Sequence, residues 1–138
     1  FHTQIFPKIK EEFVDTGLVK FVLRDFPLDG VAVEAATLAH CAGPDKYPLV
    51  ISSLYRDKER WAHAKEPLVY LRQMAPFLGV PAARFQAHHH AKDFVGAITK
   101  MAFEGQQQYA IKGTPSFIIG GKLYAGILTF ERFSERLV

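Results

Sequence analysis

Residues 113–126 read Gly-Thr-Pro-Ser-Phe-Ile-Ile-Gly-Gly-Lys-Leu-Tyr-Ala-Gly and contain the clearest structural signal in the chain. The Gly120-Gly121 pair separates two short runs, Ser116–Ile119 and Lys122–Ala125. Two such runs joined by two glycines predict a β-hairpin. Pro115 directly precedes the first run, and a cis peptide bond is largely a proline option. A plain trans turn at Thr114-Pro115 is the alternative on the local sequence.

The apolar residues in the rest of the chain follow two further spacings. Residues alternate between two faces over Leu18–Arg24, which predicts a strand with one face made of Val19, Phe21 and Leu23. Over residues 31–111 the spacing of apolar residues is helical. Thr129 can cap a last helix. The predicted order is therefore helix, strand, a long series of helices, hairpin and helix.

The first helix has two interpretations, because Pro7 lies inside its pattern. The helix either begins at Pro7, where a proline in the first turn is harmless, or is longer and kinked at Pro7. The stripe that predicts it has a spacing of four residues and consists of Phe1, Ile5, Ile9 and Phe13. Because the stripe continues back to Phe1, the second interpretation is favoured.

The composition indicates one folded protein with a substantial core. Of the 138 residues, 49% are apolar and 13% are aromatic, which excludes a disordered chain. No apolar stretch reaches the ~18 residues that a membrane-spanning helix needs. The net charge of +3 is spread along the chain rather than gathered into a basic tract. We therefore expect neither membrane insertion nor a nucleic-acid partner.

Four segments resemble those of the DsbA-like thiol–disulfide oxidoreductases, a thioredoxin-fold family. In chain order they are Phe1-His2 with Phe6-Pro7-Lys8, Arg24-Asp25-Phe26-Pro27-Leu28, Gly113-Thr114-Pro115-Ser116-Phe117, and Gly120-Gly121-Lys122 through Gly126. The resemblance covers nearly the whole chain and implies an α/β, thioredoxin-like fold with a large inserted helical domain. Residues 1–30 and 111–138 would form the thioredoxin-like domain, and residues 31–110 the insert.

Two parts of the family pattern are missing from this sequence. The Cys-x-x-Cys pair would lie shortly before Phe1, and so would the strand that runs between Leu18–Arg24 and Ser116–Ile119 in a thioredoxin fold. Lone strands and hairpins with free edges are not independently stable. We therefore expect residues before Phe1 that complete the sheet, or a strand exchanged between two copies in a swapped dimer.

Cys41 is the only cysteine, so the sequence can form no internal disulfide. Many relatives carry a second cysteine pair in the helical domain. Cys41 matches one of its members, but His88 stands at the position of the other. We therefore expect Cys41 to be a buried, small apolar residue near no second sulfur. Trp61 and Tyr70 are expected to pack inside the helical domain.

The resemblance also implies site residues. A cis proline in this family turns the chain so that the preceding residue's backbone can pair with an extended substrate peptide, which assigns substrate binding to Thr114 and Pro115, with Phe117 behind them. His2 would be a neighbour of the active site. Three adjacent histidines on a helix point about 100° apart, so His88-His89-His90 is interpreted as surface rather than as a metal site. No metal and no cofactor are expected.

The function implied by the resemblance is disulfide exchange with extended reduced or misoxidised substrate proteins, served by a redox partner protein in an exported compartment such as the bacterial periplasm. The catalytic thiolate would be stabilised at a helix N-terminus. Because both catalytic cysteines would lie before Phe1, the sequence alone is expected to be inactive. Two alternatives remain: a non-redox peptide-binding or chaperone-like module, and a glutathione-dependent relative of the kappa-transferase or isomerase type.

Overall fold

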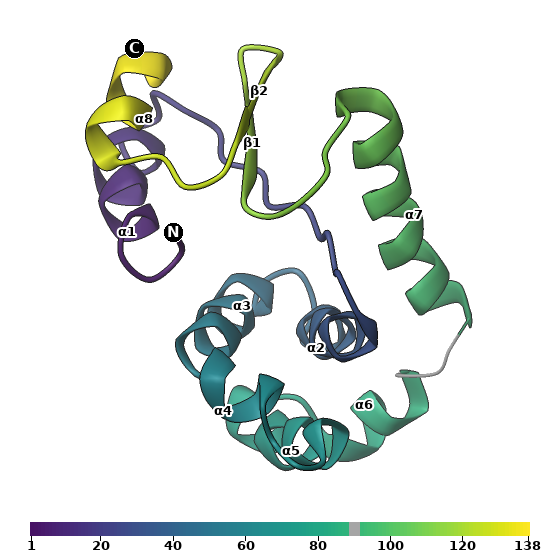
Figure 1. Ribbon diagram of the computed structural model, residues 1–138. Coiled ribbons are helices and arrows are strands. Elements are labelled where there is room, and N and C mark those ends of the chain that lie inside the picture. The colour runs from purple at the N-terminus through teal and green to yellow at the C-terminus, as the bar shows by residue number, and fades with distance from the viewer. Residues whose placement is uncertain (89–91) are drawn as a thin grey trace. The chain divides into compact units, whose positions relative to one another are not determined.

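A computed structural model describes residues 1–88 and 92–138 (Figure 1). The chain divides into two compact units. The first unit consists of residues 1–24 and 104–138, and the second of residues 25–103. Helix α7 (Lys92–Tyr109) begins in the second unit and ends in the first. In the described part of the chain, no helix is both long and apolar enough to cross a membrane.

The first unit opens with α1 (Phe6–Ile9), which continues directly into a π-helical segment, η1 (Lys10–Val14). Pro7 lies in the first turn of α1, where its missing N–H breaks no helical hydrogen bond. Residues 2–5 form a turn in which the N–H groups of Ile5 and Phe6 donate to the Phe1 carbonyl oxygen at 2.8 and 3.0 Å. The interpretation as a longer helix kinked at Pro7 is therefore wrong.

The hairpin forms as predicted from strands β1 (Ser116–Ile119) and β2 (Lys122–Ala125). The strands are antiparallel, with Ser116 opposite Ala125 and Ile119 opposite Lys122. Gly120 and Gly121 both have positive φ, +55° and +79°, which a two-residue turn of this kind requires and glycine supplies without steric cost.

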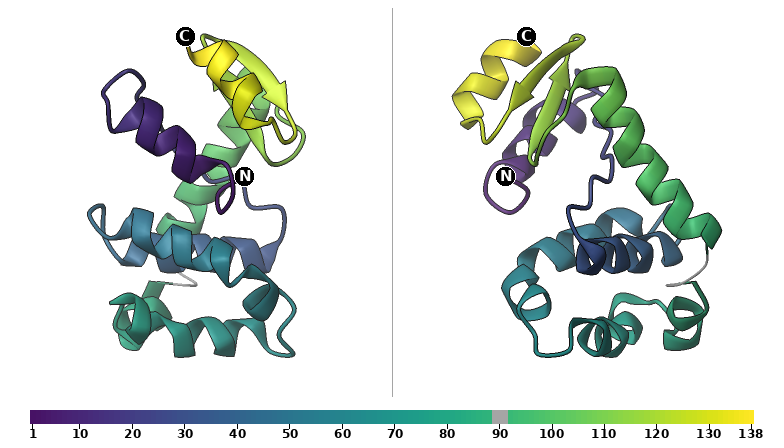
Figure 2. Two further views of the ribbon diagram at one scale, coloured as in Figure 1. Left: turned by 90° about the vertical axis from the view of Figure 1, so that its left-hand side faces the viewer. Right: turned by 45° about the vertical axis from the view of Figure 1, so that its right-hand side comes forward.

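The first unit ends with α8 (Phe130–Leu137). The Thr129 hydroxyl caps this helix by accepting the N–H of Arg132 at 3.3 Å, which confirms the predicted cap. Helix α8 lies beside α1 and the hairpin in both views of Figure 2. The four buried residues of this core are Ile9, Phe13, Leu128 and Phe133. Around them pack half-buried apolar side chains, namely Phe1, Ile5, Phe6, Val19, Phe117, Ile119, Tyr124, Phe130 and Leu137.

The predicted strand Leu18–Arg24 is wrong as a paired element. The alternation itself is present, because Val19, Phe21 and Leu23 are half-buried whereas the residues between them are exposed. Among the residues that the structure describes, however, residues 20–24 have no backbone hydrogen-bond partner. A strand exists only when a neighbouring strand accepts and donates its hydrogen bonds, and the described sheet contains β1 and β2 alone.

The second unit is helical, and α2 (Gly30–Cys41) runs through its middle (Figure 1). Asp29 caps α2, because its Oδ1 accepts the N–H of Ala32 at 2.8 Å. Around α2 lie α3 (Tyr47–Arg56), α5 (Pro67–Met74) and α6 (Ala82–His88). Two short segments complete the unit, α4 (Lys58–Ala62) and the 3₁₀ turn η2 (Ala75–Leu78). The helical spacing predicted over residues 31–111 did not show where these short segments interrupt the series.

The core of the second unit is well covered. Leu38, Leu71, Val80 and Phe85 are 0% exposed. The Trp61 ring is buried as expected, and its indole N–H donates to the Leu54 carbonyl oxygen at 2.7 Å. Each of these side chains comes from a helix or a tight turn whose backbone hydrogen bonds are satisfied locally, so the unit closes around α2 without a sheet.

Candidate functional site

The loop at residues 113–116 is held by two hydrogen bonds. The Ser116 hydroxyl donates to the Gly113 carbonyl oxygen at 2.7 Å, and the Gly126 N–H donates to the Pro115 carbonyl oxygen at 2.9 Å. The peptide bond between Thr114 and Pro115 is cis, the geometry expected for this loop. Thr114 is exposed and Pro115 is half-buried. The loop therefore presents Thr114 to solvent from a fixed backbone.

An aromatic cluster supports this loop from inside the first unit. The Phe117 ring, two residues after Pro115, packs edge-on against Phe1 and Phe133, with centroid distances of 4.7 Å in both pairs. Phe1 also contacts Phe6 at 5.8 Å, and Phe6 lies 4.4 Å from Phe21. Tilted and edge-on ring pairs at such distances are favourable beyond their area burial. The cluster links the start of the chain and the extended segment to strand β1.

His2 is half-buried next to this cluster, with its ring centroid 5.1 Å from that of Phe6. Burial lowers the pKa of the His2 imidazole below its ordinary value, which favours the neutral ring. Because the neighbouring Phe1 touches Phe117, the segment that carries His2 and the strand that follows Pro115 lie in one cluster. A neutral imidazole of this kind can accept a proton at one ring nitrogen and donate a hydrogen bond from the other.

Cys41 takes no part in this cluster, because it lies on α2 in the second unit. Its thiol is 1% exposed and forms no disulfide, so the prediction of a buried, unpaired cysteine is confirmed. Burial raises the pKa of the thiol above its ordinary value. Since the thiolate is the nucleophile in disulfide exchange, both properties make Cys41 a poor reactant.

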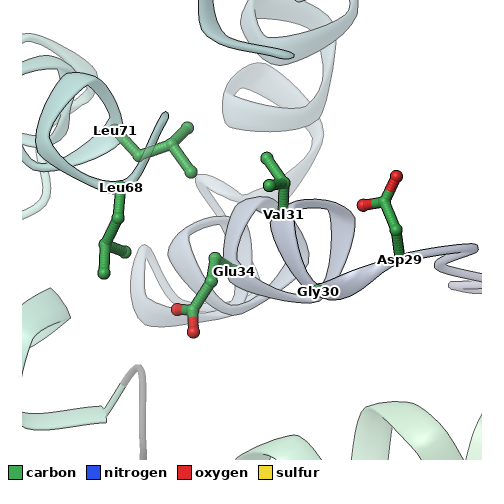
Figure 3. Close-up of a pocket in the computed structure, with 6 residues that line it drawn as sticks. All are labelled: Asp29, Gly30, Val31, Glu34, Leu68 and Leu71. Atoms are coloured by element: carbon green, nitrogen blue, oxygen red, sulfur yellow. The ribbon is translucent and has the colours of Figure 1, made fainter. Parts of the chain in front are cut away.

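Neither the histidine triplet nor a pocket in the second unit adds to the site. His88 is half-buried with its ring 5.3 Å from that of Phe94, while His89 and His90 lie outside the described residues. Residues 1–88 and 92–138 bring together no group of three metal-binding side chains. A pocket of about 530 Å³ lies between α2 and α5 (Figure 3) and is lined by Asp29, Gly30, Val31, Glu34, Leu68 and Leu71. None of the predicted site residues lines it.

The family follows from a comparison of the whole sequence with known proteins. A protein-family model described as Thioredoxin matches residues 1–137. The chain belongs to this thioredoxin family. Crystal structures of Wolbachia pipientis alpha-DsbA1 have the same fold, with a TM-score of 0.88 over 99% of this chain and 75% of that protein, at 23% sequence identity. The predicted DsbA-like, thioredoxin-type fold is thereby confirmed.

The curated relatives of this thioredoxin-family chain have disulfide-related names. A provisionally named protein-disulfide oxidoreductase of Rickettsia felis is 27% identical over 123 residues, which are 88% of this chain and 44% of that protein. Disulfide bond formation protein D of Bacillus cereus, also a provisional name, is 24% identical over 127 residues, 86% of this chain and 57% of that protein. The chain thus spans about half the length of the curated relatives it matches.

One polar cluster of this thioredoxin-family chain was not predicted from the sequence. The Asp25 carboxylate contacts His40 Nε2 at 2.5 Å and accepts the Tyr47 hydroxyl at 3.1 Å. The three residues are 15 and 22 positions apart, and no motif spacing signals such a contact. The only hint in the sequence is an acidic residue directly after an alternating segment, where a charged side chain becomes buried only if a partner is present.

Proposed function

We propose that this chain is the larger part of a thiol–disulfide oxidoreductase whose catalytic Cys-x-x-Cys pair is supplied by residues preceding Phe1. Thr114 and Pro115 would hold an extended substrate peptide, and His2 would lie beside the cysteines. Residues 1–30 and 111–138 would act as the thioredoxin-like domain and residues 31–110 as its helical insert. Membership of the thioredoxin family and the disulfide-related names of the relatives support this proposal.

The observation that carries the proposal is the position of the Thr114–Pro115 loop. Thr114 is exposed, and the strand that follows the loop contacts Phe1 through the Phe117 ring. A catalytic pair preceding Phe1 would be joined to a residue whose ring touches the strand after Pro115. Thr114 is exposed, and the hydrogen bonds of its neighbours leave it in place to meet a substrate. A fixed loop with a free backbone beside the reacting sulfur lowers the entropic cost of positioning the peptide.

The chemistry is an exchange of two electrons. A substrate thiolate attacks one sulfur of the enzyme disulfide, which forms a mixed disulfide and releases the other enzyme sulfur as a thiolate. A second substrate thiolate then attacks the substrate sulfur of the mixed disulfide, so that the substrate leaves with a disulfide and the enzyme with two thiols. A redox partner protein would reoxidise the enzyme by the same steps in reverse, and such chemistry belongs in an exported, oxidising compartment such as the periplasm.

The test compares the natural protein, with the residues that precede Phe1, with the chain that starts at Phe1. The natural protein should oxidise a reduced two-cysteine peptide, and the Phe1–Val138 chain should not, because Cys41 is its only thiol and is buried. Replacing the pair Pro115→Ala and Thr114→Gly in the natural protein should raise the KM for the peptide. Cys41→Ala is the matched control and should leave the rate unchanged.

The outcomes separate the alternatives. A natural sequence without two cysteines before Phe1 would overturn the proposal in favour of a peptide-binding or chaperone-like module, and peptide binding would then persist without any redox activity. A serine in their place, together with activity that depends on glutathione, would indicate the kappa-transferase or isomerase type. A redox rate that falls with Cys41→Ala would show that the reacting sulfur has been assigned to the wrong segment.

A further inference from the structure

The pocket between α2 and α5 has no role in the proposed redox site, and its lining combines carboxylates with apolar side chains. Its volume of about 530 Å³ is in the range of pockets that hold small molecules. All of its lining residues belong to the second unit. The start of α2 and the helix α5 contribute them, namely Asp29, Gly30, Val31, Glu34, Leu68 and Leu71.

The lining residues differ in exposure from one side of the pocket to the other. Asp29 and Gly30 are exposed, Glu34 and Leu68 are half-buried, and Leu71 is 0% exposed. A Cβ atom built on Gly30 would meet no other atom within 4 Å, so the pocket is open at this residue. The pocket therefore has a polar mouth at the start of α2 and an apolar floor on α5.

The charge of the pocket comes from Asp29 and Glu34. Among the described residues that line it, these two alone are titratable, and both are carboxylates. The start of a helix favours negative charge, and Asp29 already supplies it, because its Oδ1 accepts the Ala32 N–H at 2.8 Å. A bound anion would be repelled by both carboxylates, whereas a cation is attracted by both. The pocket is therefore suited to a cationic ligand.

The two carboxylates are separated along α2. Asp29 and Glu34 are five positions apart, which corresponds to about 7.5 Å along a helix axis. Figure 3 shows the two side chains at different places on α2, with Leu68 and Leu71 on the neighbouring helix. A linear molecule with a cationic group at each end suits this separation better than a compact cation does. Its alkyl stem can lie on the apolar floor while its ends stay near water.

We propose that this pocket binds a short linear diamine of the putrescine type. One ammonium group is held by Asp29 and the other by Glu34, and the alkyl stem lies on the two leucines of α5. Charge-assisted hydrogen bonds fix the two ends, and burial of the methylene groups adds to the affinity. The site is independent of the proposed redox chemistry, because none of its residues is among the predicted redox-site residues.

The test follows the binding of putrescine to the natural protein by an NMR titration. The amide signals of residues 29–34 and 68–71 should shift with one common Kd. n-Butylamine keeps the stem and one charge, and it should bind roughly two- to tenfold more weakly, because one hydrogen-bonded charge pair is lost. Butanediol keeps the stem without any charge and should shift none of these signals at the same concentration.

Three variants test which side chains hold the ligand. Glu34→Gln removes one charge at nearly constant volume, and it should weaken putrescine binding roughly two- to tenfold. Asp29→Asn does the same at the mouth and preserves the α2 cap, because asparagine caps helices as well as aspartate does. Gly30→Leu places a side chain in the open mouth and should abolish the shifts. Glu59→Gln removes an exposed carboxylate on α4, outside the lining, and is the matched control with an unchanged Kd.

Two kinds of result overturn the proposal. Putrescine that shifts no signal at residues 29–34 and 68–71, or that binds Asp29→Asn and Gly30→Leu with an unchanged Kd, would show that the pocket is not its site. These two variants also decide the matter if Glu34→Gln does not fold. n-Butylamine that binds as tightly as putrescine would show that only one carboxylate is used, and the diamine would then be the wrong class of ligand.

Discussion

The two units of this thioredoxin-family chain bury their apolar residues to different extents. In the helical unit, side chains from four elements reach 0% exposure, among them Leu71 and Phe85. In the sheet-bearing unit, the most buried apolar side chains are Ile9 and Phe133 at 3% and 4%. A larger group of half-buried apolar residues surrounds them, including Phe117. The helical unit has a closed core, and the sheet-bearing unit has an incompletely covered one.

The difference follows from where helices and strands find the partners of their backbone hydrogen bonds. A helix pairs its N–H and C=O groups within itself, so α2 and its neighbours need only side-chain packing. A strand needs a partner, and the extended residues 20–24 have none in the described part of the chain. The helical unit therefore depends on local pattern and burial, whereas residues 20–24 of the sheet-bearing unit have no paired strand among the described residues.

Supplying that strand should have the largest effect. If residues precede Phe1, as the proposed function requires, they should pair with residues 20–24 and with β1, and thereby cover the half-buried aromatic cluster. Amide exchange of residues 20–24 should be fast in the Phe1–Val138 chain and slow in the longer protein, while exchange in α2 stays the same. Slow exchange with a dimeric mass in the shorter chain would indicate a swapped strand instead, and slow exchange in a monomer would contradict the predicted topology.

Truncating one aromatic side chain in each unit should show the next largest effect. Phe85→Ala removes a fully buried ring and should lower the free energy of unfolding by about 3–5 kcal/mol. Phe117→Ala removes a half-buried ring, which should cost roughly half as much, because part of its surface is already in contact with water. Urea unfolding of both variants measures this. Equal losses would mean that the core of the first unit is as closed as that of the second.

The same comparison explains which features could be predicted from the sequence. The hairpin turn and the α8 cap were predicted because Gly120-Gly121 and Thr129 act on residues within three positions of themselves. Over Leu18–Arg24 the alternation predicted correctly which side chains are half-buried, because successive side chains of an extended segment point to opposite faces. The alternation could not show whether Leu18–Arg24 pairs with another strand, because that depends on where a second segment of the chain lies.

The candidate site divides in the same way. The resemblance placed Thr114 and Pro115 in one loop, and the structure supplies the Ser116 and Phe117 contacts that fix it. The contact between Asp25 and His40 was not predicted, because it joins the end of an extended segment to the last turn of a helix. Such contacts depend on tertiary packing, which composition and period do not describe.

At alkaline pH the helical unit should weaken through Tyr47. Burial, together with the Asp25 carboxylate, raises the pKa of the Tyr47 phenol well above its ordinary value of 10.0. Above pH 10 the unfolded chain therefore releases a proton that the folded chain keeps, so the unfolded state binds fewer protons and stability falls as the pH rises. Tyr47→Phe should abolish this part of the pH dependence and cost about 1–2 kcal/mol at pH 7 through the lost hydrogen bond.

The measurement is urea unfolding at pH 7 to 11, supported by the ultraviolet absorbance of tyrosinate in the native protein. A fraction of the native absorbance change should come late, and it should be smaller in Tyr47→Phe, because burial raises the pKa of the Tyr55 phenol as well and Tyr55 keeps its share. Tyr70→Phe on α5 is the control and should leave the late fraction in place. If Tyr47→Phe keeps the full loss of stability above pH 10, another group is responsible for it.

The smallest effects should come from the two helix caps, and they test whether the units unfold together. Asp29→Ala and Thr129→Ala each remove a side-chain acceptor at a helix start and should each cost ~1 kcal/mol.

Trp61 is the only tryptophan and is buried in the helical unit, so its fluorescence reports the unfolding of that unit. Because the two units have separate cores, Asp29→Ala should lower the urea midpoint seen by Trp61, and Thr129→Ala should leave it unchanged. The exposed Thr3→Ala controls for the loss of a threonine elsewhere in the first unit. Equal shifts from both caps would mean that the two units unfold as one cooperative structure.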